Sequence, residues 1–259
     1  MTSSDQNEDD VKPSGAKVLG RESLRAALPK RFYKEAGVAE APGGFRITLD
    51  RRIVKTPGKK ELVVPARNLA LAIADEWAAQ AERIDPATMP LTRLANVAID
   101  AVAEHMADVA ADIEAYAASD LLCYRALGPE GLVQRQHAYW DPVLAWAERE
   151  IGVRLVVRQG VMPVAQESAA TAAVGIAIQG LDAFRLACVH VMTTLTGSAL
   201  LALAHLKGRL TAEQAWSAAT VDETWQVEHW GRDAEAEARD EQRRADFEAA
   251  SRLVTLLGP

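Results

Sequence analysis

Hydrophobic and polar positions alternate in the stretch from about residue 32 to Pro65. Phe45, Ile47 and Leu49 alternate with polar residues, and short apolar runs follow at 53–54 and 62–64. Residues typical of turns separate these runs, namely Gly43, Gly44, Asp50, Pro57 and Gly58. Alternation that is broken in this way predicts short antiparallel strands.

After Pro65 the hydrophobic positions recur every three or four residues, which indicates helices. The first predicted helix spans 67–83, and its apolar stripe comprises Leu69, Ile73, Trp77 and Ala81. Because Trp77 lies on this stripe, we expect its side chain to be a core residue that supports folding.

One long helix is expected over 92–118, with Thr92 as its N-cap. The side chains expected to face the core along it are Leu94, Val97, Val102, Met106, Val109 and Ile113. Further helices are expected at 131–150, 167–179, 181–206, 211–229 and 232–257, with a short strand or extended connector at 153–158. Thr211 and Gln214 have the spacing of a capping box that opens the helix 211–229.

These patterns predict an α+β protein in which a small β-rich N-terminal domain precedes a larger, mainly α-helical domain. The expected boundaries are a disordered acidic tail over 1–20, the β-rich domain over 21–66 and the helical domain over 67–259. The tail is expected because its opening residues, MTSSDQNEDD, are polar and acidic.

Residues 186–206 carry no formal charge and are long enough to cross a bilayer. They contain His190 and His205 and several hydroxyl side chains, however, and no aromatic belt or basic cluster flanks them. The pattern therefore favours a buried helix at the centre of a helical domain, with no stable membrane insertion. A membrane-associated factor that uses this segment is the weaker alternative.

Composition narrows the function classes. The net charge is −7 and the isoelectric point is about 5.4, and no long Lys/Arg run is present, so nucleic acid is not an expected partner. Cys123 and Cys188 lie among apolar residues and are expected to be buried free thiols, as in a reducing compartment. The N-terminus has neither the apolar core of a secretory signal nor the character of a mitochondrial presequence, which favours a bacterial cytoplasmic protein.

The motifs of common catalytic sites are absent from the sequence. There is no phosphate-binding loop, no strand–GxGxxG–helix unit, no GxSxG turn and no HExxH helix. We therefore expect a protein that is not an enzyme and that uses no cofactor.

The segment 223–237, ETWQVEHWGRDAEAE, combines tryptophans, a histidine and several acids around Gly231. On a helix, Glu223, Val227 and Trp230 share one face, whereas Glu228 lies on another. Gly231 is expected to bend or end this helix. Asp233 is expected near the start of the next helix, where a negative charge is favourable.

Two functions are open for this segment. Glu228, His229 and Asp233 could bind a divalent metal, as in a metal-dependent hydrolase, although no second ligand cluster is evident. Alternatively, the acids could pair with basic groups of a protein partner while tryptophan supplies apolar contact area. The second interpretation requires no further residues, so the preferred binding residues are Glu223, Glu228, Trp230 and Asp233, and no metal site is predicted.

Seven motifs in a fixed order carry a family resemblance, namely RFYKEAGV, DRRIVKTP, ADEWAAQ, MPLTRLANVAID, ASDLLCYRA, WDPVLAWAE and VEHWGRDAEAE. Over about residues 30–257 the sequence resembles the ATP synthase assembly chaperones that protect the alpha subunit of the catalytic head. This resemblance implies that the chain binds the free alpha subunit and prevents its aggregation until a beta subunit replaces it.

The same resemblance implies roles for individual residues. Glu228 and Asp233, the acids of VEHWGRD, are the positions implied for binding or release of the alpha subunit. Asp120, Tyr124 and Arg125 of SDLLCYRA are implied contributors to the domain junction or to the interface.

Overall fold

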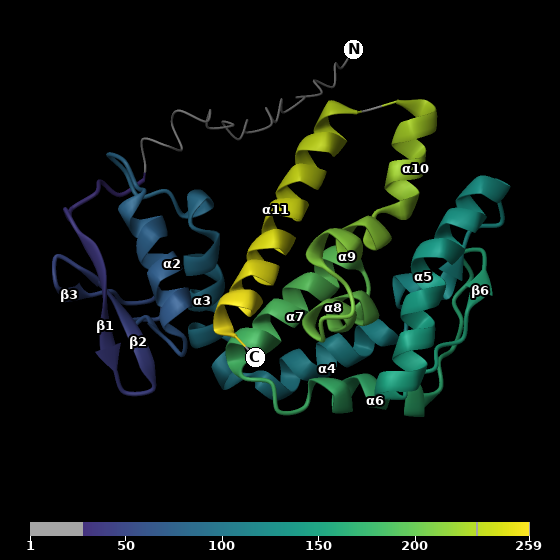
Figure 1. The fold of residues 1–259 in the computed structure, drawn as a ribbon, viewed down its shortest axis with the longest axis horizontal. Coiled ribbons are helices and arrows are strands. Elements are labelled where there is room, and N and C mark those ends of the chain that lie inside the picture. Colours follow the sequence, from purple (N-terminus) through teal and green to yellow (C-terminus); the bar gives the residue numbers. More distant parts are fainter. Residues whose placement is uncertain (1–27, 232, 259) are drawn as a thin grey trace, which may run out of the picture.

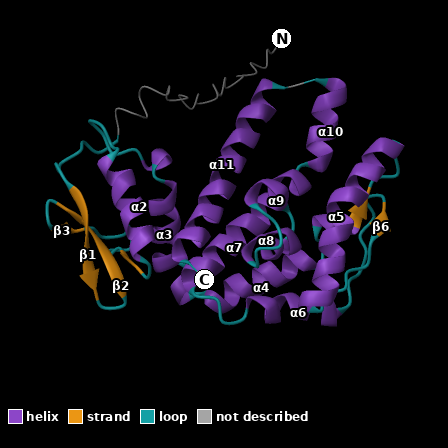
Figure 2. Cartoon of the chain, in the orientation of Figure 1, coloured by secondary structure: helices purple, strands orange, loops and turns teal. Residues whose placement is uncertain are grey.

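The computed structural model describes residues 28–231 and 233–258 (Figure 1). The expected tail over 1–20 lies outside the described residues, as does the start of the expected β-rich domain at 21–27. A sheet follows in the N-terminal part and helices form most of the rest (Figure 2). The predicted α+β class is therefore confirmed, whereas the predicted domain boundaries stay a prediction.

The sheet has four antiparallel strands, which are β1 (Ala36–Ala41), β2 (Gly44–Leu49), β3 (Arg52–Ile53) and β4 (Val63–Val64). Strand β2 pairs with all three others, and its alternating Ile47 and Leu49 side chains are buried. Gly44 begins β2 with a φ of +152°, and a Cβ there would lie 2.2 Å from the Val64 carbonyl oxygen. Glycine is therefore required where the β1–β2 turn passes β4.

Helix α2 (Arg67–Ala78) packs against β1 and β2 and buries Leu69 and Ile73. Trp77 is half-buried and packs against the core, with its ring edge-to-face with Tyr33 at 5.8 Å between centroids. This confirms that Trp77 packs against the core. The predicted stripe was wrong at Ala81, which is exposed because α2 ends three residues before it.

The single long helix expected over 92–118 is in fact two helices, α3 (Pro90–Asp100) and α4 (Met106–Ala117), joined through a 3-10 turn at Val102–Glu104. Val97 and Met106, expected in the core, are exposed, whereas Val102 and Ile113 are buried. The loop before β4 holds the end of α3. Thr56 Oγ1 and the Gly58 amide donate to the Asp100 carboxylate at 2.6 and 2.7 Å, and Lys60 Nζ donates to the Ile99 carbonyl at 3.0 Å.

Thr92 does not cap this helix. It is buried inside α3, and the Glu76 carboxylate of α2 takes the capping role. Glu76 accepts hydrogen bonds from the backbone amides of Leu91 and Thr92, each at 2.8 Å, and from the Thr92 hydroxyl at 2.7 Å. A carboxylate at this position also faces the positive end of the helix dipole.

The uncharged segment 186–206 falls in two buried helices, α7 (Ala183–Thr196) and α8 (Ala199–Leu206), rather than in one. Gly197 ends α7 in the left-handed conformation, with a φ of +67°. Both helices contribute to the hydrophobic core, and none of the helices among the described residues is long and apolar enough to cross a membrane. Cys188 of α7 and Cys123 are buried free thiols, as predicted, and burial raises the pKa of each to about 12.

The remaining helices are α5 (Glu130–Ile151), α6 (Ser168–Ile178), α9 (Ala212–Ala219), α10 (Val221–Trp230) and α11 (Ala234–Leu257). The capping box of Thr211 and Gln214 is present at the start of α9. The helix expected over 211–229 breaks at Thr220, whose hydroxyl donates to the Trp216 carbonyl at 2.9 Å.

The segment expected at 153–158 is mainly an extended connector. Only Arg158 belongs to a strand, β6 (Arg158–Gln159), which pairs in parallel with β5 (Tyr124–Arg125).

Candidate functional site: the groove between α10 and α11

Helices α10 and α11 rise from the body of the molecule towards the same end, and the chain turns between them there (Figure 1). Gly231 ends α10 with a φ of +88°. Asp233 then caps α11, because its Oδ1 accepts a hydrogen bond from the Ala236 amide at 2.8 Å. Both expectations for this junction are confirmed.

Helix α10 is fixed to α5 by a charged pair and an aromatic contact. Arg135 of α5 donates two hydrogen bonds to the Glu228 carboxylate, at 3.0 and 2.8 Å, and its guanidinium carbon lies 5.1 Å from the Trp225 ring centroid. Gly131 gives that ring room, since a Cβ at this position would lie 2.6 Å from Trp225. The His229 ring also stacks on Trp225, with 4.1 Å between the ring centroids.

The four predicted binding residues lie around one end of the molecule but in different environments. Glu228 is exposed, and the hydrogen bonds from Arg135 lower the pKa of its carboxyl group. Trp230 is 74% exposed, whereas Glu223 is half-buried and burial raises the pKa of its carboxyl group. Asp233 is exposed and forms the cap of α11.

A groove with a volume of about 470 Å³ lies between these helices. Most of its lining residues belong to α10 and α11, and α9 and α5 contribute the others, apart from Thr220 and Asp233 at the helix ends. Its charged lining residues are mainly carboxylates, from Glu213, Glu223, Asp233, Glu237, Asp240 and Glu241. Val227 lines the groove together with Glu223, as their shared face predicts, but Trp230 lies beyond the lining residues.

Sequence reasoning missed two parts of this site. Arg135 is 93 residues from Glu228, and no local pattern links them. The acids of α11 could have been found from the sequence. Their spacing of three and four residues places Asp233, Glu237, Asp240 and Glu241 on one helix face.

The three residues of the metal-site alternative point to different partners. Glu228 binds Arg135 and Asp233 caps α11, while His229 Nδ1 donates to the Trp225 carbonyl at 2.8 Å. Within residues 28–231 and 233–258, no group of three or more His, Cys, Asp or Glu side chains is arranged to hold a metal ion. The hydrolase alternative therefore has no geometric support in this part of the chain.

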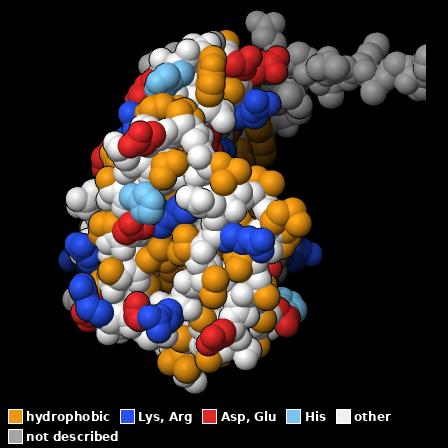
Figure 3. All heavy atoms as spheres, turned by 90° about the vertical axis from the view of Figure 1, so that its right-hand side faces the viewer, with side chains coloured by type: hydrophobic (Ala, Val, Ile, Leu, Met, Phe, Trp, Pro, Cys, Tyr) orange, Lys and Arg blue, Asp and Glu red, His pale blue; other side chains and the backbone are white. Residues whose placement is uncertain are grey.

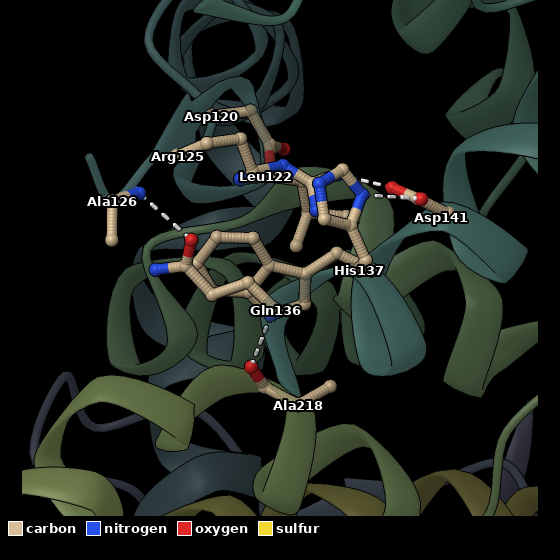
Figure 4. A network of polar contacts seen from close by, with 9 residues as sticks. Asp120, Leu122, Arg125, Ala126, Gln136, His137, Asp141 and Ala218 are labelled. Carbon is tan, nitrogen blue, oxygen red and sulfur yellow. Dashed lines mark hydrogen bonds and ion pairs between the residues drawn. The ribbon is translucent and has the colours of Figure 1, made fainter. Parts of the chain in front are cut away.

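Asp120 and Arg125 lie inside the helical part, beside α5 (Figure 4). Asp120 is fully buried, and its carboxylate accepts hydrogen bonds from the amides of Leu122 at 3.0 Å and of Leu200, in the first turn of α8, at 3.2 Å. Burial nevertheless raises the pKa of Asp120 to about 6. This position makes Asp120 an interior residue, so it is not available at a partner interface.

The Arg125 side chain is also interior, with an exposure of only 3%. It donates to Asp141 of α5 at 2.7 Å and lies 5.0 Å above the Trp140 ring, while Tyr124 beside it is half-buried (Figure 4). The interface role implied for Asp120 and Arg125 is therefore wrong, and their contacts stabilise the packing of α5 and α8.

The face that carries α5 and β6 exposes many hydrophobic side chains between its charged groups (Figure 3). The most exposed apolar residues around β5 and β6 are Leu127, Val161 and Met162, at 79%, 93% and 65%. Surfaces of this kind are typical of proteins that bind other proteins.

An acid-lined groove, an exposed tryptophan and an apolar neighbouring face are features typical of surfaces that bind other proteins. The model of the family described as ATP12 chaperone protein matches residues 30–148. A crystal structure of Atp12 from Paracoccus denitrificans, and that of a point mutant of it, are 42% identical to this chain, with a TM-score of 0.84. Each match covers 88% of this chain and 98% of the other.

A crystal structure from Agrobacterium tumefaciens, of a protein described as a candidate chaperone, is 44% identical, with a TM-score of 0.85. This match covers 95% of this chain and 92% of the other. The chain therefore belongs to the ATP12 chaperone family, which confirms the resemblance found in the sequence. Membership of a chaperone family implies a non-catalytic role.

Proposed function

We propose that this chaperone binds the free alpha subunit of the ATP synthase catalytic head and holds it until a beta subunit takes its place. Family membership and the seven sequence motifs support this client.

The observation that carries the proposal is the exposure of Trp230 beside the groove. Its side chain is 74% exposed at the last position of α10, and Val227 one turn earlier is 40% exposed. Because exposed tryptophan gains much from burial against a partner, it is a typical energetic centre of a protein interface. Glu228 on the same helix and Asp233 at the start of α11 add exposed negative charge near this end of α10, which can orient the client.

Simple binding is sufficient for the proposed activity. A chaperone that binds the folded but unassembled subunit stabilises it by mass action, without a hydrolysis cycle. Release then requires only a beta subunit that covers the same surface with higher affinity. The contacts of Arg135 with Glu228 and Trp225 join α10 to α5, and contacts that fix a binding element beforehand reduce the entropy lost on binding.

Light scattering of the purified alpha subunit tests this proposal. We expect the chaperone to suppress aggregation of the warmed alpha subunit at near-equimolar ratio and to leave aggregation of the isolated beta subunit unchanged. Equal scattering of the alpha subunit with and without the chaperone would contradict the proposal.

A further inference from the structure

The groove between α10 and α11 has an excess of negative charge. Among residues 28–231 and 233–258, six carboxylates line it, together with two cationic residues, Arg135 and Arg244. Both guanidinium groups are already engaged. Arg135 binds Glu228, and Arg244 binds Glu213 at 2.6 Å and Glu248 at 2.8 Å. These two guanidinium groups are therefore already paired with carboxylates other than Glu223 and Glu241.

Glu223 and Glu241 are the carboxylates with the least compensation. Among the described residues, neither forms an ion pair with a basic side chain. The positive charge of Arg243 lowers the pKa of Glu223, but Arg243 is itself paired with Asp240 at 3.1 Å. Burial outweighs that attraction and raises the pKa of Glu223. A half-buried carboxylate that lacks an ion-pair partner is stabilised when a cation is brought next to it.

The base of the groove is apolar. Trp216 and Val221 lie there and are almost completely buried, and Val227 and Ala236 line the opposite walls. A lysine or arginine side chain matches this arrangement, because its aliphatic stem packs on apolar surface while its charged end reaches a carboxylate. The volume of about 470 Å³ suits a few such side chains rather than a whole helix.

We propose that this groove receives a basic segment of the client, whose lysine or arginine side chains pack on Trp216 and Val227 and pair with Glu223 and Glu241. This inference rests on the proposed function for the identity of the client, and it adds the chemistry of the segment that enters the groove. Trp230 then contacts the client outside the groove, at the end of α10.

A peptide assay tests the groove separately from the alpha subunit. The probe is a short fluorescent peptide of lysine, leucine and alanine, and its counterpart replaces each lysine with glutamate. We expect the basic peptide to bind the full-length chaperone with an affinity that falls as salt is added, since charged contacts are screened. Equal binding of the acidic peptide would overturn the proposal.

Two variants with the same change in charge locate the binding site. Glu241→Lys alters an exposed lining residue, whereas Glu235→Lys alters an exposed residue of α11 that does not line the groove. We expect Glu241→Lys to weaken peptide binding about tenfold and Glu235→Lys to change it little. Similar affinities of the two variants, each with a wild-type melting temperature, would overturn the assignment to the groove.

Glu223→Gln distinguishes pairing from packing, because it removes charge and keeps the shape of the side chain. We expect it to weaken peptide binding and to reduce its salt dependence, while unchanged binding would contradict the pairing. If the peptide binds as expected but the alpha subunit is not protected, only the proposed client is wrong. If the alpha subunit is protected but the groove variants behave as wild type, only the groove assignment is wrong.

Discussion

Arg135 and Glu228 form a pair of parallel hydrogen bonds, at 3.0 and 2.8 Å, that joins α5 to α10 across 93 residues of sequence. The same guanidinium lies over Trp225, so one side chain positions both the acid and the aromatic ring. These contacts fix the position of α10 against α5. The Glu228 carboxylate is therefore charged and already oriented before a client binds.

The first prediction concerns Glu228→Ala. Because its ion pair with Arg135 is exposed to solvent, the variant should fold and should keep nearly the wild-type melting temperature. Protection of the alpha subunit, measured by light scattering, should decrease, since the loss leaves Arg135 unpaired at the proposed interface.

A matched control for this variant is Glu104→Ala, which breaks an exposed ion pair with Lys60 in another part of the molecule. It should protect the alpha subunit as well as wild type does. Unchanged protection by Glu228→Ala would remove Glu228 from the binding site.

The second prediction concerns Trp230→Ala. Its ring is 74% exposed, so the variant should unfold at the wild-type denaturant concentration. Its affinity for the alpha subunit should fall by about tenfold or more, as for an aromatic interface centre. Phe32→Ala is the control, because Phe32 is 70% exposed in the N-terminal part, and it should bind normally. Equal affinities of the two variants would show that Trp230 is outside the interface.

The third prediction concerns Trp77→Arg, which should act on stability. The Trp77 ring packs against the core and contacts Tyr33, and a guanidinium there would be partly desolvated without an arranged partner. We expect the free energy of unfolding to fall by about 2–4 kcal/mol. Urea denaturation measures this change, and Trp77→Phe should lose clearly less. Wild-type stability of Trp77→Arg would show that Trp77 does not support the core.

The fourth prediction concerns the pH dependence that Asp120 creates. Burial raises its pKa to about 6 from 3.8, so the folded state binds this proton at a higher pH than the unfolded state does. The contribution of Asp120 to stability therefore increases as pH falls from about 7 towards 4. Relative to Asp120→Asn, the wild-type protein should gain about 2–3 kcal/mol over this range.

Urea unfolding of both proteins at several pH values measures this difference, because other carboxylates contribute equally to each. A constant difference between wild type and Asp120→Asn across this range would contradict the burial-driven shift.

The features that could be predicted from the sequence are those set by neighbouring residues. The capping box of Thr211 and Gln214, the placement of Asp233 near the start of α11 and the interruption of the helix at Gly231 depend on residues within a few positions, and all three were predicted correctly. The start of α3 could not be predicted, because Glu76 of another helix supplies its cap. Its end depends on a loop more than 40 residues away, through the bonds of Thr56 and Gly58 to Asp100.

In the candidate site too, the features set by neighbouring residues could be predicted and those set by distant residues could not. The pattern of segment 223–237 indicated a helix junction with acids and an exposed tryptophan, and the structure has this arrangement. It could not reveal that Arg135 pairs with Glu228, or that the acids of α11 face Glu223 across a groove. Asp120 and Arg125 were expected at the domain junction or at the interface, and the interface alternative was wrong because a charged residue in a motif does not show whether its carboxylate or guanidinium is buried.

The most direct measurement of the central claim is binding between the purified chaperone and purified free alpha subunit, followed by addition of the beta subunit. We expect a stable complex on size-exclusion chromatography, which Trp230→Ala weakens, and release of the chaperone when the beta subunit is added. Separate elution of chaperone and alpha subunit at concentrations where both are folded would contradict the account.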